Sequence, residues 1–409
     1  DALELADDVL SRVLGVFYNL AGADATPARE ALMREFSPKL AAYGSEITMN
    51  AALFQRIELL WEARDDLGLS DEQARVLYLT RRGFVRAGAA LQGADRDRLS
   101  AIKERLAVLG TGFTQNLLAD ERDWSMPLSK GDLADLPEFV QDAARAAGEE
   151  KGSDGPVVTL SRSIIVPVLQ FSPNRALRQR AYEAWTARGA NGGTTDNRAI
   201  AAEILALRAE RATLLGYDSF ADFKLETEMA GTPDAVRDLL MQVWAPAKAS
   251  AEADSAALQD LLVTDGQAGP LEPWDWRYYS QKRRKQLHDL DEAELKPYLQ
   301  LDRLIEAVFS VTNRLFGLEF RALDGTLYHD DARAWEVTRD GQHLAVFIGD
   351  YFARGSKRSG AWCSAMRSQK KLGGDVRPIV VNICNFAKPS QGKPALLSYD
   401  DARTLFHEF

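Results

Sequence analysis

The chain has 409 residues, of which 46% are hydrophobic and 27% are charged, and its formal net charge is −10. This acidic balance lacks the basic footprint of a nucleic-acid-binding protein, and no run of about eighteen apolar residues could span a bilayer. Two cysteines, Cys363 and Cys384, exclude a disulfide framework but leave one bridge between them open. We therefore expect no nucleic-acid or membrane partner, and a cytoplasmic location, or a periplasmic one if a leader was removed.

Helical patterns dominate the first two thirds of the chain. Residues 1–150 are predicted to form a helical N-terminal lobe, with a long helix marked by apolar residues at spacings of three and four from Leu99 to Leu117. Residues 151–330 are predicted to be a second helical region that contributes to both lobes. Within it, residues 157–160 and 164–166 are β-branched and predict a short hairpin, and a helix starts at Ser172 with Pro173.

Residues 331–409 change period and predict a small β-sheet followed by the start of a helix. Asp340 and Gly341 have the chemistry of a type I′ turn, so the segments on either side read as a hairpin. Residues 360–363 and 379–384 read as two further strands. Within the second of these, Cys384 is predicted to be a buried small hydrophobe.

The final helix is predicted to begin near Tyr399. Ser398 can act as its N-cap, with Asp401 three residues later completing a capping box. An apolar stripe that faces a core is then formed by Ala402, Leu405, Phe406 and Phe409. His407 projects well away from this stripe, because successive residues turn by about 100°.

His407 and Glu408 form the first half of the pattern H-E-x-x-H. In that pattern two histidines one turn apart hold one Zn²⁺, and the glutamate takes a proton from metal-bound water. The pair alone is weak evidence, and a histidine on a solvated helix face explains the bare tripeptide better. The decision therefore depends on the residues upstream.

Gly360, Ala361 and Trp362 are the candidate edge of the predicted sheet. An extended peptide can add to a free edge as one more strand, and small residues allow its backbone to approach closely. Gly360 could equally relieve crowding at a bend. The residues by themselves leave both interpretations open.

Several longer stretches of the sequence favour the functional interpretation of both His407 and Gly360. These stretches resemble the thimet-oligopeptidase-like (M3) family of zinc metallopeptidases, and most of all its bacterial peptidyl-dipeptidases. The stretches, which follow the family's order over most of the chain, are FVRAGAAL at 84–91, PWDWRYY at 273–279, LKPYL at 295–299, GDYFAR at 349–354, KRSGAW at 357–362, VNICNF at 381–386 and LFHEF at 405–409. The resemblance implies a mainly α, two-lobed, zincin-like metallopeptidase with a deep central channel and a small β-sheet next to the zinc-binding helix.

The same resemblance implies roles for individual residues. His407 is expected to be the first ligand of one Zn²⁺ per complete enzyme and Glu408 the general base. Gly360, Ala361 and Trp362 are expected to pair with the substrate. The family's remaining zinc ligands are expected beyond residue 409, so we expect both ends of the chain to be incomplete, and the remainder of the enzyme to be a partner, either as a separate chain or missing.

The expected activity is hydrolysis of short oligopeptides with release of C-terminal dipeptides, with these 409 residues inactive alone. The group that grips the free C-terminal carboxylate is expected in the remainder. Two alternatives stay open: an endo-acting oligopeptidase of the same family, and a noncatalytic helical scaffold that binds peptides.

Overall fold

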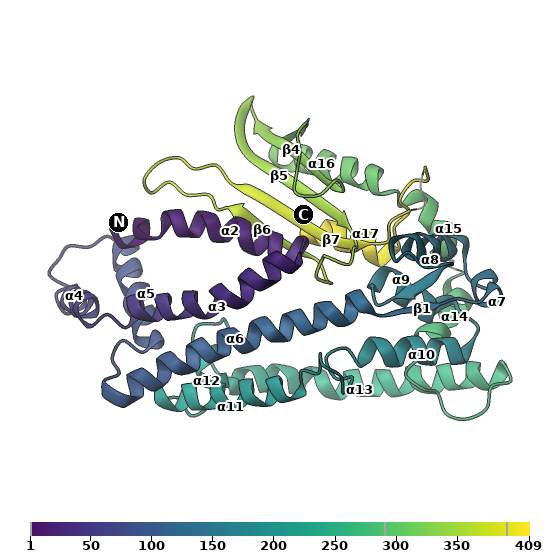
Figure 1. The fold of residues 1–409 in the computed structure, drawn as a ribbon, viewed down its shortest axis with the longest axis horizontal. Coiled ribbons are helices and arrows are strands. Elements are labelled where there is room, and N and C mark those ends of the chain that lie inside the picture. The colour runs from purple at the N-terminus through teal and green to yellow at the C-terminus, as the bar shows by residue number, and fades with distance from the viewer. Residues whose placement is uncertain (1, 290–291, 390–391) are drawn as a thin grey trace. The chain divides into compact units, whose positions relative to one another are not determined.

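The structure is a computed structural model that describes residues 2–289, 292–389 and 392–409. Most of these residues are helical, and the strands form two small sheets, so the protein is mainly α, as the sequence predicts (Figure 1). The chain divides into two compact units: unit 1 consists of Asp1–Pro27, Leu118–Arg188 and Glu252–Phe409, and unit 2 of Ala28–Leu117 and Gly189–Ala251. The three-part division at residues 150 and 330 stays a prediction.

Unit 2 consists of helices and the loops that join them. Its core includes Ile102, Leu109 and Leu207, and the expected long helix is present as α6. Ion pairs from Arg98 to Glu210 and from Arg105 to Glu203 join α6 to α11. The helices are α3 (Pro27–Thr48), α4 (Ala51–Glu62), α5 (Asp71–Ala87), most of α6 (Gly93–Asp123), α11 (Arg198–Leu214), α12 (Phe220–Leu225) and the first part of α13 (Pro233–Thr264).

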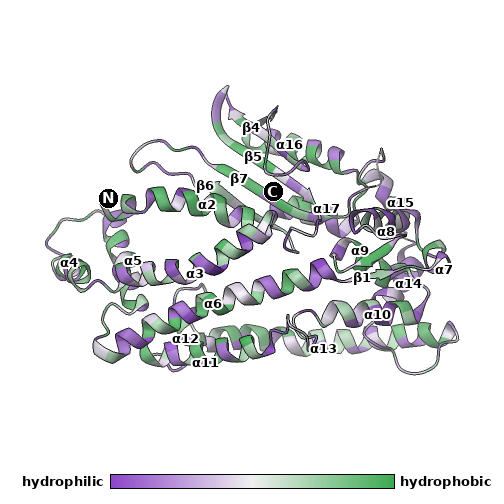
Figure 2. Ribbon diagram, in the orientation of Figure 1, coloured by the Kyte–Doolittle hydropathy of each residue, from purple (hydrophilic) through white to green (hydrophobic). Residues whose placement is uncertain are grey.

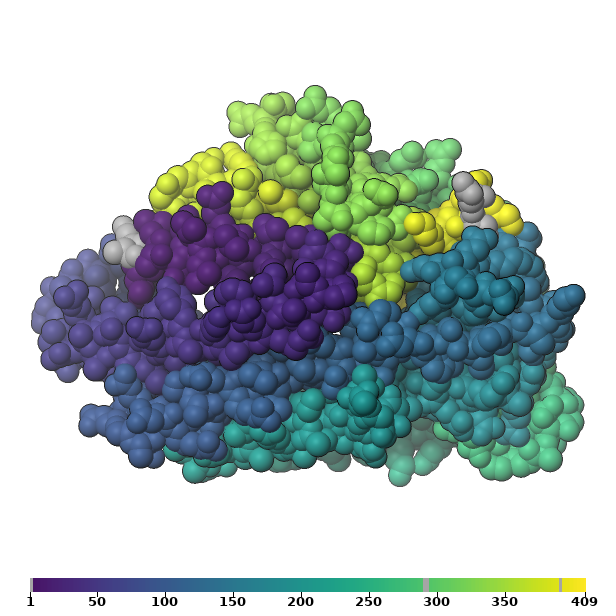
Figure 3. All heavy atoms as spheres, in the orientation of Figure 1, coloured from purple at the N-terminus to yellow at the C-terminus, as the bar shows by residue number. Residues whose placement is uncertain are grey.

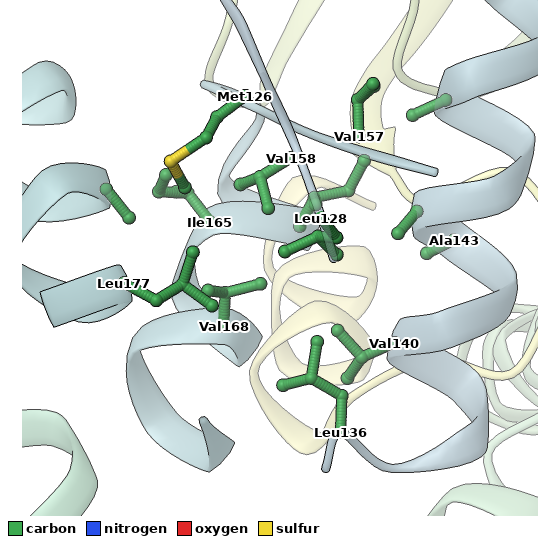
Figure 4. Packing of buried hydrophobic residues seen from close by; sticks show 14 of the residues in the cluster. Met126, Leu128, Leu136, Val140, Ala143, Val157, Val158, Ile165, Val168 and Leu177 are labelled. Atoms are coloured by element: carbon green, nitrogen blue, oxygen red, sulfur yellow. The ribbon is translucent and has the colours of Figure 1, made fainter. Parts of the chain in front are cut away.

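Unit 1 begins with α1 (Ala2–Ala6) and α2 (Asp8–Ala23) and continues with one apolar core around a two-stranded sheet. In Figure 4 the side chains of Met126, Val158, Val168 and Leu177 point into this core. Its elements are β1 (Ser125–Pro127), α7 (Lys130–Ala134), α8 (Glu138–Glu150), β2 (Val157–Thr159), α9 (Arg162–Phe171) and α10 (Arg175–Thr186).

The predicted hairpin in this region is half wrong. The first predicted strand is β2, but it pairs with β1 and not with residues 164–166, which lie in α9. In α9, Ile164, Ile165, Val168 and Leu169 are buried at helical spacing, and this packing outweighs the β-branched preference for strands. The start of α10 is also shifted, because Asn174, and not Ser172, caps it by accepting a hydrogen bond from Leu177 N.

The remaining elements of unit 1 are helices followed by a five-stranded sheet with strand order β3-β4-β5-β7-β6. The β4–β5 turn has positive φ at both Asp340 and Gly341, which confirms the predicted turn chemistry, and Gly317 ends α16 in the left-handed region. The elements are α14 (Trp276–His288), α15 (Glu292–Leu295), η1 (Lys296–Tyr298), α16 (Leu301–Phe316), β3 (Glu319–Leu323), β4 (Ala332–Arg339), β5 (Gln342–Phe352), β6 (Trp362–Arg367), β7 (Ile379–Phe386) and α17 (Tyr399–Glu408).

Both faces of this sheet are covered, which explains the strongly apolar β7 in Figure 2. On one face Val381 and Ile383 pack with Ala23 of α2. On the other face Cys384 and Phe386 pack with residues of α16 and α17. Figure 3 shows atoms of α2, at the purple end of the colour scale, beside those of the C-terminal strands of the same unit. The position of α17, the helix that carries His407, is therefore set by its packing against the sheet.

Candidate active site

The helix α17 begins where the sequence predicts. Ser398 Oγ accepts a hydrogen bond from Asp401 N at 3.0 Å, and the Asp401 carboxylate accepts one from Ser398 N at 3.3 Å. This capping box satisfies two of the backbone donors that a helix leaves open at its N-terminus. Burial raises the pKa of the Asp401 carboxyl. The start of α17 is thus set by local hydrogen bonds.

The packing of α17 onto the sheet decides which way His407 points. Ala402 and Leu405 are buried, and the Phe409 ring lies 5.3 Å from the Phe347 ring, between centroids. Phe406 is 47% exposed and Phe409 is 38% exposed, so the predicted core stripe is confirmed for Ala402 and Leu405 and wrong for Phe406, while Phe409 is only partly covered by its ring contact with the sheet. The contacting stripe is narrow, and Phe406 is turned by about 100° from Leu405, which places it outside the stripe. His407 is exposed.

His407 and Glu408 line a cavity of about 1070 Å³ in unit 1, together with Gly360 and Ala361. Within the described residues, neither His407 nor Glu408 has a hydrogen-bond partner, so both side chains are available to a ligand. Burial and, more weakly, the nearby Glu408 carboxylate raise the pKa of the Cys363 thiol. Cys363 belongs to β6, so Glu408 lies beside the sheet edge.

The edge itself is β6, the last strand in the sheet order. The strand begins at Trp362, so Gly360 and Ala361 lie just before it and not within it. The second half of β6 is covered by α2, since Asn19 Nδ2 donates to the carbonyl oxygen of Ala365 at 3.2 Å. By the alternation of a strand, the backbone groups of Cys363 and Ala361 point to the same outer side. The part of the edge nearest the cavity is therefore the part suited to pair with a peptide.

Trp362 lies on the opposite face from Cys363. Its side chain packs in the cluster with Ile383 and Val381, and the Arg358 guanidinium lies 4.5 Å from its ring centroid. Gly360, Ala361 and Trp362 were all predicted to pair with the substrate. Among the described residues, Gly360 and Ala361 line the cavity, but Trp362 does not. The backbone of Trp362 remains on the edge strand.

The loop before β6 is held by Asn385, a residue that the sequence analysis missed. Asn385 Nδ2 donates to the carbonyl oxygens of Arg358 and Gly360, at 2.9 and 2.6 Å. Gly360 has φ of +97°, a conformation that other residues rarely adopt, and a Cβ there would meet nothing within 4 Å. Space above Gly360 is thus open, and its backbone conformation, rather than crowding, requires glycine.

A buried ionic network braces the same loop. Lys357 and Asp350 are both fully buried, and Lys357 Nζ lies 2.7 Å from Asp350 Oδ1. The ammonium also lies within hydrogen-bond distance of the carbonyl oxygens of Asp350, Phe352 and Cys384, at 3.1, 2.6 and 2.9 Å. It therefore joins the ends of the parallel strands β5 and β7 immediately beside the cavity.

The Asp350 carboxylate has two further partners. Arg354 donates to its two oxygens at 2.8 and 2.6 Å, and the Tyr328 hydroxyl donates at 2.7 Å. Burial opposes the charge of Asp350, but the hydrogen bonds from Arg354 and the charge of Lys357 lower its pKa on balance. Burial lowers the pKa of Lys357 to about 8. The sequence did contain a sign of this network, because Asp350 is a charged residue within the apolar stretch of β5.

The family relationship follows from the sequence of this region and its surroundings. The model of Peptidase family M3 matches residues 168–409, which includes β6, β7 and α17. The chain belongs to peptidase family M3. Its membership confirms the resemblance seen in the motifs.

Relatives of this M3 chain are known in bacteria and yeast. It is 36% identical to the dipeptidyl carboxypeptidase of Escherichia coli, with 100% of this chain and 60% of the relative aligned. It is 31% identical to the oligopeptidase A of Salmonella typhimurium, with 99% and 61% aligned, and 24% identical to the saccharolysin of Saccharomyces cerevisiae, with 91% and 54% aligned. The chain thus spans about three fifths of the length of the bacterial relatives.

The described residues do not form a metal site by themselves. Within 2–289, 292–389 and 392–409, no group of three or more His, Cys, Asp or Glu residues could hold a metal ion. Cys363 and Cys384 are both free thiols, so the open question of a bridge between them is answered, and Cys384 is buried as predicted. None of the helices in the described part of the chain has the length and apolarity to cross a membrane.

Proposed function

We propose that the complete enzyme to which these residues belong is a zinc metallopeptidase that cuts short peptides and releases C-terminal dipeptides. The observation that carries this proposal is the shared cavity: a histidine and a glutamate from α17 line it with Gly360 and Ala361, next to a sheet edge. An imidazole, a carboxylate and a strand edge are the parts that metal-assisted peptide hydrolysis needs.

His407 is the one imidazole that α17 offers to a metal. Its ring is exposed and has no partner among the described residues, which fits a ligand role. A zinc site needs two more protein ligands, and we propose that they come from outside these described residues. Bound there, zinc would polarise the scissile carbonyl and acidify a water molecule.

Glu408 acts as the general base in this proposal. It lines the same cavity and stands next to Cys363 of the edge strand, so its carboxylate lies on the side where a paired peptide would run. It takes a proton from the attacking water and passes it to the leaving amine. Its lack of a hydrogen-bond partner in the described residues leaves both oxygens ready for this transfer.

The substrate lies along the first part of β6. Main-chain hydrogen bonds to Ala361 and Cys363 hold an extended peptide without regard to its side chains, while Trp362 contributes its backbone to the edge. The positive φ and open space at Gly360 let the peptide backbone pass close by. Short peptides are the preferred substrates because this site lies inside a cavity.

Replacing Glu408 with Gln in the full-length enzyme tests the proposal. Loss of the base should lower kcat by at least about 100-fold and leave bound zinc unchanged. The noncatalytic scaffold predicts that peptide binding and any background hydrolysis stay the same. Unchanged hydrolysis in Glu408→Gln would therefore reject the mechanism.

The second candidate is the endo-acting oligopeptidase, since some relatives are named for oligopeptides and not for the release of dipeptides. Hydrolysis of one peptide with a free or an amidated C-terminus separates the two, because a dipeptidase should lose the amidated substrate. The dipeptidyl carboxypeptidase relatives, aligned over the whole of this chain, support the exopeptidase.

A further inference from the structure

The N-terminus of α9 is a second feature of the same cavity. Ser161 is the N-cap residue of α9, but its side chain makes no capping hydrogen bond. Its Oγ is buried and has no partner within the described residues. Serine at this position normally caps, so the unused hydroxyl is an unexplained polar group. Ser161, Arg162 and Ser163 all line the cavity.

The backbone of α9 leaves further donors open. Ile164 N and Ile165 N donate to the Ser161 carbonyl oxygen, at 3.0 and 2.8 Å. The N–H groups of Arg162 and Ser163 have no acceptor among the described residues. A helix of ten residues carries a partial positive charge at this end, which favours an anion.

Arg162 adds a full positive charge at the same place. Its side chain is exposed to the cavity and forms no ion pair with any described residue. The neighbouring carboxylate, Asp400, is occupied by Arg403 at 2.8 Å. Burial and the charge of Arg162 both lower the pKa of Arg277, which shows that another cation lies nearby. Arg162 thus offers the cavity a positive charge that no described carboxylate pairs with.

Hydrogen bonds join this end of α9 to the strand edge. Ser163 Oγ donates to the carbonyl oxygen of Asn385, whose side chain holds Gly360. Ser161 and Arg162 of α9 line the same cavity as His407 and Glu408 of α17. A peptide held at the two catalytic residues therefore shares this cavity with the N-terminus of α9.

We propose that Ser161, Arg162 and the open N–H groups of α9 form a subsite for the free C-terminal carboxylate of the peptide. The inference rests on the proposed peptidase function and names the group that would make it a dipeptidase. It differs from the expectation that this group lies outside the 409 residues. The carboxylate receives a charged hydrogen bond from Arg162 and backbone hydrogen bonds from the helix N-terminus.

The first test uses the full-length enzyme and one N-acetylated alanine pentapeptide, with either a free or an amidated C-terminus. Arg162→Gln should lower the preference for the free acid, as a ratio of kcat/KM values, by roughly 10- to 100-fold, the loss expected for one charge-assisted hydrogen bond. Arg162→Lys should restore part of the preference. The matched control is Arg145→Gln on α8, which removes an exposed arginine that does not line the cavity.

Ser161→Ala separates recognition from a structural role. Because Ser161 Oγ makes no capping bond, its loss should leave the thermal midpoint unchanged while lowering the preference for the free acid. An unchanged preference in both Arg162→Gln and Ser161→Ala would overturn the subsite. If Ser161→Ala lowers the thermal midpoint but leaves the preference for the free acid unchanged, Ser161 stabilises the fold, and its role in the carboxylate subsite is overturned.

A binding experiment keeps this inference independent of catalysis. The 409-residue protein is titrated with acetyl-Ala-Ala and with its C-terminal amide, and binding is followed by ligand-observed NMR. The free acid should bind more tightly to the wild type, and Arg162→Gln should remove the difference. If the full-length enzyme hydrolyses neither pentapeptide, the proposed function fails, and this titration alone then supports or rejects the carboxylate site.

Discussion

Lys357 offers the sharpest test of how the site is supported. The Lys357→Met variant keeps a long apolar stem but removes the ammonium that joins β5 to β7. Breaking a buried ion pair by removing one partner costs about 3–5 kcal/mol. Arg354 and Tyr328 still donate hydrogen bonds to the Asp350 carboxylate in the variant. We therefore expect a loss of stability at the lower end of this range, about 3 kcal/mol.

The assay is thermal unfolding of the 409-residue protein, followed by circular dichroism. A loss of about 3 kcal/mol should lower the midpoint by about 6–12 °C, at about 2–4 °C per kcal/mol for a folding unit of this size. Hydrogen exchange should place the loss in β5, β7 and the loop to Gly360. Lys388→Met is the matched control, because Lys388 lines the same cavity but its own side chain is 53% exposed in its pair with Asp331. That variant should stay within about 2 °C of the wild type.

The pH dependence of stability provides a second, independent test of the role of Lys357. Burial lowers the folded-state pKa of Lys357 from 10.5 to about 8, so between these values the unfolded chain binds more protons. Stability from this group therefore rises as pH increases from about 8 to 10.5. The neutral amine can still donate to the carbonyl oxygens of Phe352 and Cys384 without the cost of burying a charge, whereas Lys357→Met has no donor and lacks that rise. The gap between wild type and variant should widen over this window. A Lys357→Met midpoint within 2 °C of the wild type, or a gap that narrows, would refute the reasoning.

Three further outcomes follow from the site. Ser398→Ala should destabilise α17 by about 1 kcal/mol through loss of the capping box, measured as faster amide exchange in that helix; exchange as slow as wild type would contradict it. Gly360→Ala should cost about 1–2 kcal/mol from φ of +97° alone and raise the KM of the full-length enzyme, whereas Gly355→Ala, with ordinary φ, should not. Zinc titration of the 409-residue protein by calorimetry should show no tight one-to-one site, and a tight site would mean that the described residues hold ligands that the structure does not bring together.

Local chemistry in the sequence determined several parts of the site. The capping box at Ser398, the type I′ turn at Asp340 and the outward direction of His407 depend on residues at most a few positions apart. Hydrogen bonds over three residues and the turn of a helix fix such features wherever the segment lies. The family motifs carried the remainder of the functional prediction, including the pairing of His407 with Glu408.

Tertiary packing decided the rest, because the deciding contacts join residues far apart in the sequence. Segment 164–166 became helix when its side chains found a core on one face, and Phe406 was left exposed because only a narrow stripe of α17 meets the sheet. Asn385 acts on Gly360 across 25 residues, and α2 covers part of β6 from more than 340 residues away. No local pattern records such pairs, since burial and hydrogen bonding between distant segments exist only once the sheet has formed.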